Sequence, residues 1–188
     1  GKSTMVGDQG GPFSYPGDYF SAEAPAKYKI KGSYGHPVPV VDGKTQSAGS
    51  EAKAIVLRKE FTEEKDLFSI DYTSAYSTPN LDKLIRTFVY DRQGEGSFTV
   101  SDEFTADTPI RFETAITTQA DWKVLDDTRL LLTSGTEQMI VNIEASGKVA
   151  FTSETIEVNA PAYTRIGIAL KEQSEKGYIR LKMQAKQL

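Results

Sequence analysis

The chain has 188 residues, a formal net charge of −4, no cysteine and a single histidine, His36. This composition excludes a disulfide framework, a thiolate nucleophile and a cysteine zinc site, and one histidine cannot form a metal cage of several histidines. The mild acidity argues against a nucleic-acid surface, which needs a basic face, so nucleic acid is not an expected partner. No apolar run approaches the ~20 residues that span a bilayer, so no membrane span is predicted.

The first fifty residues are rich in glycine, proline and aromatic residues, which blocks long helices and predicts turns, irregular loops and the first strands. The aromatic residues of this region are Phe13, Tyr15, Tyr19, Phe20, Tyr28 and Tyr34. Rings in such loops either seal the edge of a core, which is the more common role, or provide surfaces on which a glycan stacks. The start of the chain lacks the apolar middle region of a signal peptide and begins with Gly instead of Met, so we expect a piece of a longer protein.

From residue 52 onward, short segments alternate between apolar and polar residues, which is typical of strands with one buried face. In chain order the predicted strands cover 54–59, 66–72, 85–90, 97–102, 110–116, 129–133, 138–144, 148–154, 165–170 and 177–183. The residues from 80 to 84, after Pro79, are compatible with a helical turn. Glycine-containing turns are predicted at 92–96, 133–135, 145–148 and 174–177.

This spacing of strands and turns predicts an all-β fold, an antiparallel β-sandwich with little helix. No break in composition divides the chain, so residues 1–188 are predicted to form a single domain. The inner faces are predicted to hold Ile55, Leu57, Phe68, Ile70, Phe88, Phe98, Val100, Ile110, Phe112, Ile140, Ile143, Phe151, Ile166, Ile168, Ile179 and Leu181.

His36 is the first candidate for chemistry, because Gly35 and Pro37 place it on a stiff loop. Stiff placement suits a ligand or a catalytic group, although a half-buried histidine that caps a strand has the same sequence pattern. Arg86 and Asp102 lie on predicted neighbouring strands and could pair across the sheet in a structural role. No phosphate loop, dinucleotide fingerprint or hydrolase motif is present.

The stretch from Met5 to Gly49 resembles the C-terminal β-sandwich of the heparinase II/III-like polysaccharide lyases. The family has an Asp-x-Gly turn, then a tyrosine-containing loop, then a Gly/Ala-His-x-x-Pro-x-Val-x-Gly-x-x-Gln run. The corresponding residues here are Asp8-Gln9-Gly10, the loop from Tyr15 to Phe20, and a run from Gly35 to Gln46 in which Pro39, Val41 and Gly43 match. The second half is similar to the family only in its rhythm of strands.

The resemblance implies a lyase in which a helical toroid supplies most catalytic groups and the sandwich closes one side of the cleft. Such enzymes act by β-elimination on uronic-acid glycans, including glycosaminoglycans, so an acidic polysaccharide is the implied substrate. The family holds a metal ion, often zinc, in the sandwich, and Asp8 and His36 match two of its ligands. The contacts to substrate implied for this chain are Tyr15, Tyr19, Tyr34 and Gln46.

The helical toroid and the upstream His-x-His-x-Asp-type motif, which normally adds a metal ligand and a catalytic histidine, are missing from this sequence. We therefore expect an incomplete zinc site, no catalytic residue in this chain and no lyase activity from it alone. The family implies a bacterial periplasmic or extracellular protein whose signal peptide is not in this chain. The alternatives are a freestanding carbohydrate-binding or structural sandwich, with Tyr15, Tyr19 and Tyr34 as a glycan platform, and, least favoured, a complete enzyme.

Overall fold

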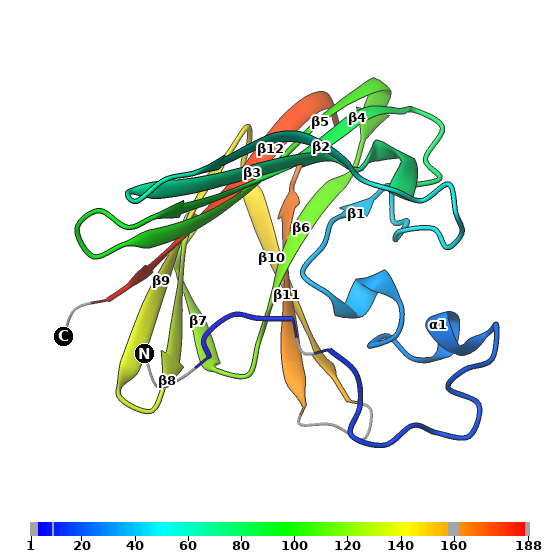
Figure 1. Cartoon of the computed structure of the whole chain (residues 1–188), viewed down its shortest axis with the longest axis horizontal. Helices are drawn as coiled ribbons and strands as arrows, with labels where there is room; N and C mark the ends of the chain where they lie inside the picture. Colours follow the sequence, from blue (N-terminus) through cyan, green and yellow to red (C-terminus); the bar gives the residue numbers. More distant parts are fainter. Residues whose placement is uncertain (1–3, 9, 158–161, 187–188) are drawn as a thin grey trace.

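A computed structural model describes residues 4–8, 10–157 and 162–186. Within these residues the chain forms two antiparallel sheets that face each other as a sandwich, so the predicted all-β fold is confirmed (Figure 1). The smaller sheet has the order β1-β6-β11-β10, and its strands are β1 (Val40–Val41), β6 (Phe112–Thr118), β11 (Tyr163–Leu170) and β10 (Val149–Ile156). The larger sheet has the order β2-β3-β4-β5-β12-β9-β8-β7, and its strands are β2 (Ile55–Phe61), β3 (Lys65–Asp71), β4 (Leu81–Asp91), β5 (Ser97–Ile110), β12 (Ser174–Ala185), β9 (Glu137–Ala145), β8 (Arg129–Ser134) and β7 (Asp121–Asp126).

The described helices are a short α1 (Ala24–Lys27) and two 3₁₀ turns, η1 (Ser33–Gly35) and η2 (Thr73–Ala75). No helix among the described residues is long and apolar enough to cross a membrane.

Two local predictions were wrong. Residues 81–84 form the start of β4 instead of a helical turn, because Leu81 and Leu84 pair with Ala106 and Phe104 of β5. Residues 174–177 belong to β12 instead of a turn. Gly177 is required there for packing, since a Cβ at this position would lie 2.7 Å from Ser146 Oγ and 2.9 Å from Phe104 Cε1. Strand β7 was not predicted from the sequence.

The main core lies between the two sheets. Phe104 of β5 stacks on Phe112 of β6 across the interface, with ring centroids 4.6 Å apart. The fully buried aliphatic side chains around this ring pair come from both sheets: Leu84, Ile110, Ile116, Leu130, Leu132, Ile166, Ile168, Ile179 and Leu181. Removing this apolar surface from water is the main driving force for sandwich formation.

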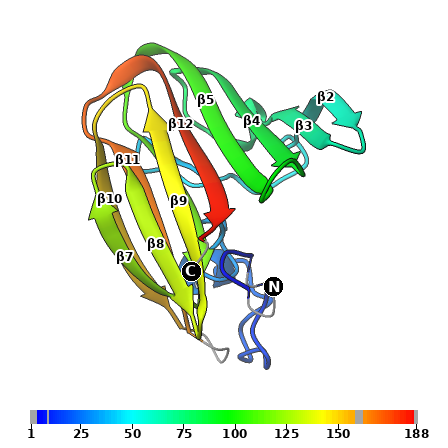
Figure 2. The same cartoon turned by 90° about the vertical axis from the view of Figure 1, so that its left-hand side faces the viewer.

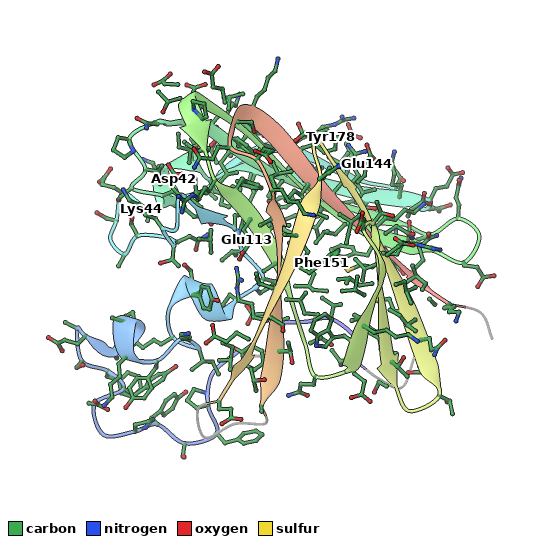
Figure 3. All side chains as sticks on the ribbon, turned by 180° about the vertical axis from the view of Figure 1, so that it is seen from behind. Asp42, Lys44, Glu113, Glu144, Phe151 and Tyr178 are labelled. Carbon is green, nitrogen blue, oxygen red and sulfur yellow. The ribbon has the colours of Figure 1, made fainter. Side chains whose placement is uncertain are left out.

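One residue, Arg111, separates β5 from β6, so the chain passes from one sheet to the other at this point. The backbone N–H of Arg111 donates to the Asp42 side chain (2.8 Å), and the Arg111 carbonyl accepts from the Asp42 N–H (2.9 Å). Asp42 adopts a positive φ of 50°, which an aspartate tolerates better than most residues. Figure 3 shows Asp42 beside Lys44, whose backbone bridges to Val41. Asp42 thus satisfies both backbone groups of the corner residue.

The larger sheet is wider than the smaller one, and its β2–β4 part extends beyond it (Figure 2). The prediction that Ile55, Leu57 and Phe98 are buried was therefore wrong: these side chains are 58%, 49% and 39% exposed. Ile55 and Leu57 lie on the edge strand β2, whose residues are all exposed. Alternation predicted which residues share a face, but not that the opposing layer ends before β2.

Polar pairs cover the outer surface of the larger sheet at its centre. The Tyr178 hydroxyl of β12 donates to Glu144 of β9 (3.0 Å), and the two side chains lie side by side in Figure 3. Arg180 also reaches Glu144 at 2.9 Å. Exposed pairs of this kind contribute little to stability.

Candidate functional site

The loop that carries His36 packs against the segment that precedes it. The Gly35 N–H donates to the Lys29 carbonyl (3.0 Å), and a Cβ on residue 35 would lie 2.3 Å from that same oxygen. Only glycine allows this approach. It brings the His36 ring next to the Ile30 carbonyl, 3.1 Å from Nε2.

Asp8 reaches His36 from the other side. The segment before Asp8 is held against β6, because the Thr118 hydroxyl donates to the Met5 carbonyl (2.5 Å) and the Gly7 N–H donates to Thr117 (3.2 Å). Asp8 Oδ1 and Oδ2 lie 2.8 and 2.9 Å from His36 Nδ1. The structure therefore brings together the two residues that were predicted as metal ligands. Gln9, the middle residue of their Asp-x-Gly turn, lies outside the described residues.

Both ring nitrogens of His36 face hydrogen-bond acceptors. The Ile30 carbonyl and the Asp8 carboxylate both only accept, so each contact requires an N–H group on the ring, whereas a neutral ring has one. In a neutral ring, one of the two nitrogens therefore directs its lone pair at an acceptor oxygen, which repels it. A metal ion bound at Nδ1 would resolve this arrangement, because the ring proton would then lie on Nε2 and face Ile30.

These donors fit zinc in kind, since imidazole nitrogen and carboxylate oxygen are both common zinc ligands. The Nε2–H bond to Ile30 is also the type of outer contact that orients a ligating histidine. They do not fit in number, because no group of three or more potential ligands occurs among the described residues. Two protein ligands are fewer than the three or four of known zinc sites.

A buried ion pair lies beneath the His36 loop. Arg86 of β4 binds Asp102 of β5 through two bonds of 2.7 Å, Nε to Oδ1 and Nη2 to Oδ2. Asp102 also accepts from the hydroxyls of Tyr72 (2.8 Å) and Thr114 (2.6 Å). Burial and the neighbouring Asp102 charge raise the pKa of Tyr72 well above its usual value. The expected structural pairing of Arg86 with Asp102 is confirmed.

A second buried arginine lies on the opposite sheet. Arg165 of β11 is 1% exposed, binds Glu113 of β6 at 2.6 Å and lies 4.3 Å from the centre of the Tyr34 ring. The Tyr34 hydroxyl donates to Glu154 (3.0 Å). Tyr34, a predicted substrate contact, is thus packed into a polar network, and Figure 3 shows Glu113 on this sheet.

The other predicted substrate contacts are placed differently from one another. Tyr19 is only 6% exposed and lies in a small second core with Ile30, Ile156 and Tyr163. Gln46 is half-buried, and its backbone N–H donates to the Ser33 hydroxyl (2.8 Å). Of the four predicted contacts, Tyr15 has the most accessible ring, at 58% exposed.

Tyr15 belongs to an exposed aromatic patch, here defined as Phe13, Tyr15 and Phe20. Phe13 and Phe20 are 83% and 74% exposed, and the Tyr15 and Phe20 rings are 5.0 Å apart. The Lys31 ammonium lies 5.3 Å from the Phe20 ring and 4.9 Å from the Tyr19 ring. Sequence reasoning considered all these rings, but it could not tell which ones stay accessible.

A pocket of about 580 Å³ lies beside the Asp8–His36 pair. Its wall includes Asp8 and Pro37, and most of its remaining surface is apolar, formed by side chains such as Phe88, Phe98 and Met183. This volume lies within the range typical of sites for small molecules. The pocket therefore extends from Asp8, one of the two candidate metal ligands, to the uncovered part of the larger sheet.

No protein-family model matches the sequence, and no curated protein sequence matches it. Solved structures do match its fold. The heparan sulfate lyase HepC from Pedobacter heparinus superimposes with a TM-score of 0.72 at 15% identity, over 96% of this chain and 28% of that one. A heparinase III with methylated lysines superimposes with a TM-score of 0.72 at 12% identity, over 98% of this chain and 28% of that one.

A further crystal structure of heparinase III gives a TM-score of 0.64 at 16% identity, over 83% of this chain and 24% of that one. The chain thus spans about a quarter of the length of the lyases that it resembles. At this level of identity the likeness is one of fold. The predicted resemblance is confirmed in that sense: nearly the whole chain has the fold of a portion of heparinase III.

Proposed function

We propose that this chain is the β-sandwich part of a bacterial polysaccharide lyase that cleaves uronic-acid glycans, including glycosaminoglycans, by β-elimination. The observation that carries the proposal is the superposition of nearly the whole chain on heparinase structures. The Asp8–His36 contact adds support, because it joins the two residues that the sequence resemblance singled out.

In this proposal a helical toroid provides the main catalytic groups, and the sandwich closes the substrate cleft. The uncovered part of the larger sheet is evidence in favour of such a partner domain. Phe61, Tyr90 and Phe98 are 68%, 46% and 39% exposed there, and the Phe68, Phe88 and Phe98 rings form a stacked row. An apolar face of this kind is commonly covered in an assembled protein.

The residues of this chain would orient the substrate and support the cleft. None of them is proposed as the base that removes the proton next to the uronate carboxylate. Asp8 and His36 would hold a zinc ion together with a ligand from outside the described residues. When bound, the zinc would supply a fixed positive charge that joins the Asp8 segment to the His36 loop.

The test is a protein extended by the coding sequence upstream of this chain. We expect that upstream sequence to encode a helical region ending in two histidines and an aspartate. The extended protein should release unsaturated uronide product, detected by ultraviolet absorbance, whereas the 188-residue chain should release none. A stop codon or an unrelated domain at the upstream position would contradict the proposal.

Two finer expectations are tested on the same protein. Elemental analysis should find about one zinc ion per extended chain, lost in His36→Ala and kept in Asp18→Ala, a carboxylate remote from the pair. Cell fractionation should find the protein in the periplasm or outside the cell. A metal-free extended protein, or one confined to the cytoplasm, would refute the respective expectation.

The second candidate function is a freestanding carbohydrate-binding module, and the exposed aromatic patch favours it. Exposed rings can stack on sugar faces, and Lys31 places a positive charge beside them for an acidic sugar. Affinity-gel electrophoresis in heparan sulfate would measure this binding. A Tyr15→Ala/Phe20→Ala variant should lose retardation, while Phe61→Ala, which removes an equally exposed ring on β2, should keep it.

A further inference from the structure

We infer that Tyr163, Arg86 and Tyr76, here called the carbonyl clamp, are positioning residues that fix the His36 loop in the geometry at which His36 meets Asp8. The inference rests on the proposed role of His36 as a metal ligand. The clamp residues lie on different elements: Tyr163 begins β11, Arg86 lies in β4, and Tyr76 follows η2.

The sequence of the loop explains why it needs outside donors. Pro37 and Pro39 lack an N–H group, so the segment cannot form a regular strand ladder. Its own backbone provides one bond, from the Val38 N–H to the His36 carbonyl (2.8 Å). The remaining carbonyls must find donors elsewhere, because buried unpaired carbonyls are costly.

The clamp supplies a donor to each alternate carbonyl. The Tyr163 hydroxyl donates to Gly35 (2.8 Å), Arg86 Nη1 donates to Pro37 (2.7 Å), and the Tyr76 hydroxyl donates to Pro39 (2.8 Å). Because Tyr163 belongs to the smaller sheet and Arg86 to the larger one, the loop is held from both layers. A longer contact of 3.5 Å joins Arg165 Nη2 to the Val38 carbonyl.

Each clamp donor is itself rigid. Tyr163, Tyr76 and Arg86 are only 2%, 5% and 6% exposed, and both Asp102 oxygens fix the Arg86 guanidinium. Burial also raises the pKa of the Tyr163 hydroxyl to about 12, so it stays protonated and able to donate near neutral pH. Rigid supports of this kind reduce the freedom of a site residue, which is what ligand positioning requires.

The neighbouring Tyr72 provides a matched control. It is 5% exposed, lies in the main core together with Tyr76, and donates its hydroxyl to Asp102 instead of a loop carbonyl. Tyr72→Phe and Tyr76→Phe therefore each remove one buried hydroxyl from the main core, and Tyr163→Phe removes one from the small second core. Only Tyr163→Phe and Tyr76→Phe remove a bond to the His36 loop.

The test measures amide hydrogen exchange and the His36 ring tautomer by NMR at a fixed pH of about 8. His36 is the only histidine, so its ring signals are unambiguous. In Tyr163→Phe and Tyr76→Phe we expect the Val38 amide to exchange roughly fivefold to tenfold faster relative to the core amides of Ile166 and Ile168, as loss of one hydrogen bond implies. The His36 ring signals should change from those of a ring whose two nitrogens are held against Asp8 and Ile30 to those of a free ring with mixed tautomers.

Tyr72→Phe should leave both readouts unchanged. If the Val38 exchange and the tautomer do not change in the Tyr163→Phe/Tyr76→Phe double variant, or if Tyr72→Phe changes them equally, the clamp is a stabilising network without a positioning role. In the extended protein the two clamp variants should also weaken zinc binding about tenfold. A wild-type extended protein that binds no zinc would refute the proposed role of His36 as a metal ligand, while the exchange and ring data would still decide the clamp.

Discussion

Arg86 and Asp102 meet through two parallel hydrogen bonds of 2.7 Å while only 6% and 1% exposed, which makes them the most deeply buried ion pair among the described residues. Burial alone would lower the pKa of Arg86, but the Asp102 charge, the hydrogen bonds to Asp102 and the neighbouring tyrosines together outweigh burial, so the net shift is upward. The pair also connects β4 to the His36 loop through Pro37. Both stability and site geometry therefore depend on it.

Loss of one partner should be much worse than loss of both. Arg86→Met leaves the Asp102 charge buried and unpaired, which should lower the free energy of unfolding by about 3–5 kcal/mol. The Arg86→Met/Asp102→Leu variant should regain much of this loss. Urea denaturation would measure both, with Arg58→Met as the control, because the Arg58–Glu60 pair is solvent-exposed. Equal losses in Arg86→Met and Arg58→Met would contradict the prediction.

Two isoleucines from the predicted core list test the extent of the real core. Ile166 is 0% exposed and lies between the sheets, so Ile166→Ala should cost about 2–5 kcal/mol. Ile55 is 58% exposed on the edge strand β2, and Ile55→Ala should change stability by less than about 0.5 kcal/mol. Thermal and urea unfolding would measure the difference. A large cost at Ile55 would mean that β2 is covered in solution.

Gly35 should tolerate no side chain. A Cβ there would lie 2.3 Å from the Lys29 carbonyl oxygen, so Gly35→Ala should destabilise the protein by at least about 1–3 kcal/mol and separate His36 from Ile30. Gly17→Ala is the control, because a Cβ at Gly17 meets nothing within 4 Å. Circular dichroism melts combined with the His36 NMR signals would detect both effects. A Gly35→Ala protein with unchanged stability would overturn this account of the loop.

Stability should fall at alkaline pH. Burial raises the pKa of Tyr163 to about 12, and burial raises the pKa of Tyr72 and Tyr76 as well, whereas unfolded tyrosine titrates near ~10. A raised folded-state pKa gives stability that is complete below pH ~10 and is lost as the pH rises toward about 12. Urea midpoints measured from pH 8 upward should therefore decrease above pH ~10. The Tyr163→Phe protein should show a smaller decrease than wild type, and parallel curves would refute the assignment.

The sequence was sufficient for the fold class because the strands from β4 onward keep a two-residue alternation and are separated by short turns. The sequence was insufficient where exposure depends on the tertiary arrangement of the two sheets. Nothing in the sequence around Ile55 and Leu57 reveals that no second layer covers β2. Gly177 looked like a turn residue, yet its lack of a side chain serves contact with Phe104.

The candidate site was predictable only in part. Asp8 and His36 could be singled out because their flanking glycines and prolines form a distinctive pattern. Tyr163 and Arg165 follow their loop partners by more than a hundred residues, and no local pattern connects them to Gly35 or Val38. Pairing across sheets at such separation arises from the fold alone.

The carbonyl clamp also makes His36 a mechanical link across the sandwich. Because its loop is fastened to β4 of one layer and β11 of the other, the two layers cannot slide past each other without moving His36. If the packed layers strengthen the binding of a ligand to His36, thermodynamic linkage requires that the bound ligand stabilise the packed layers by the same free energy. A ligand at this position would act as a reversible staple between the two sheets.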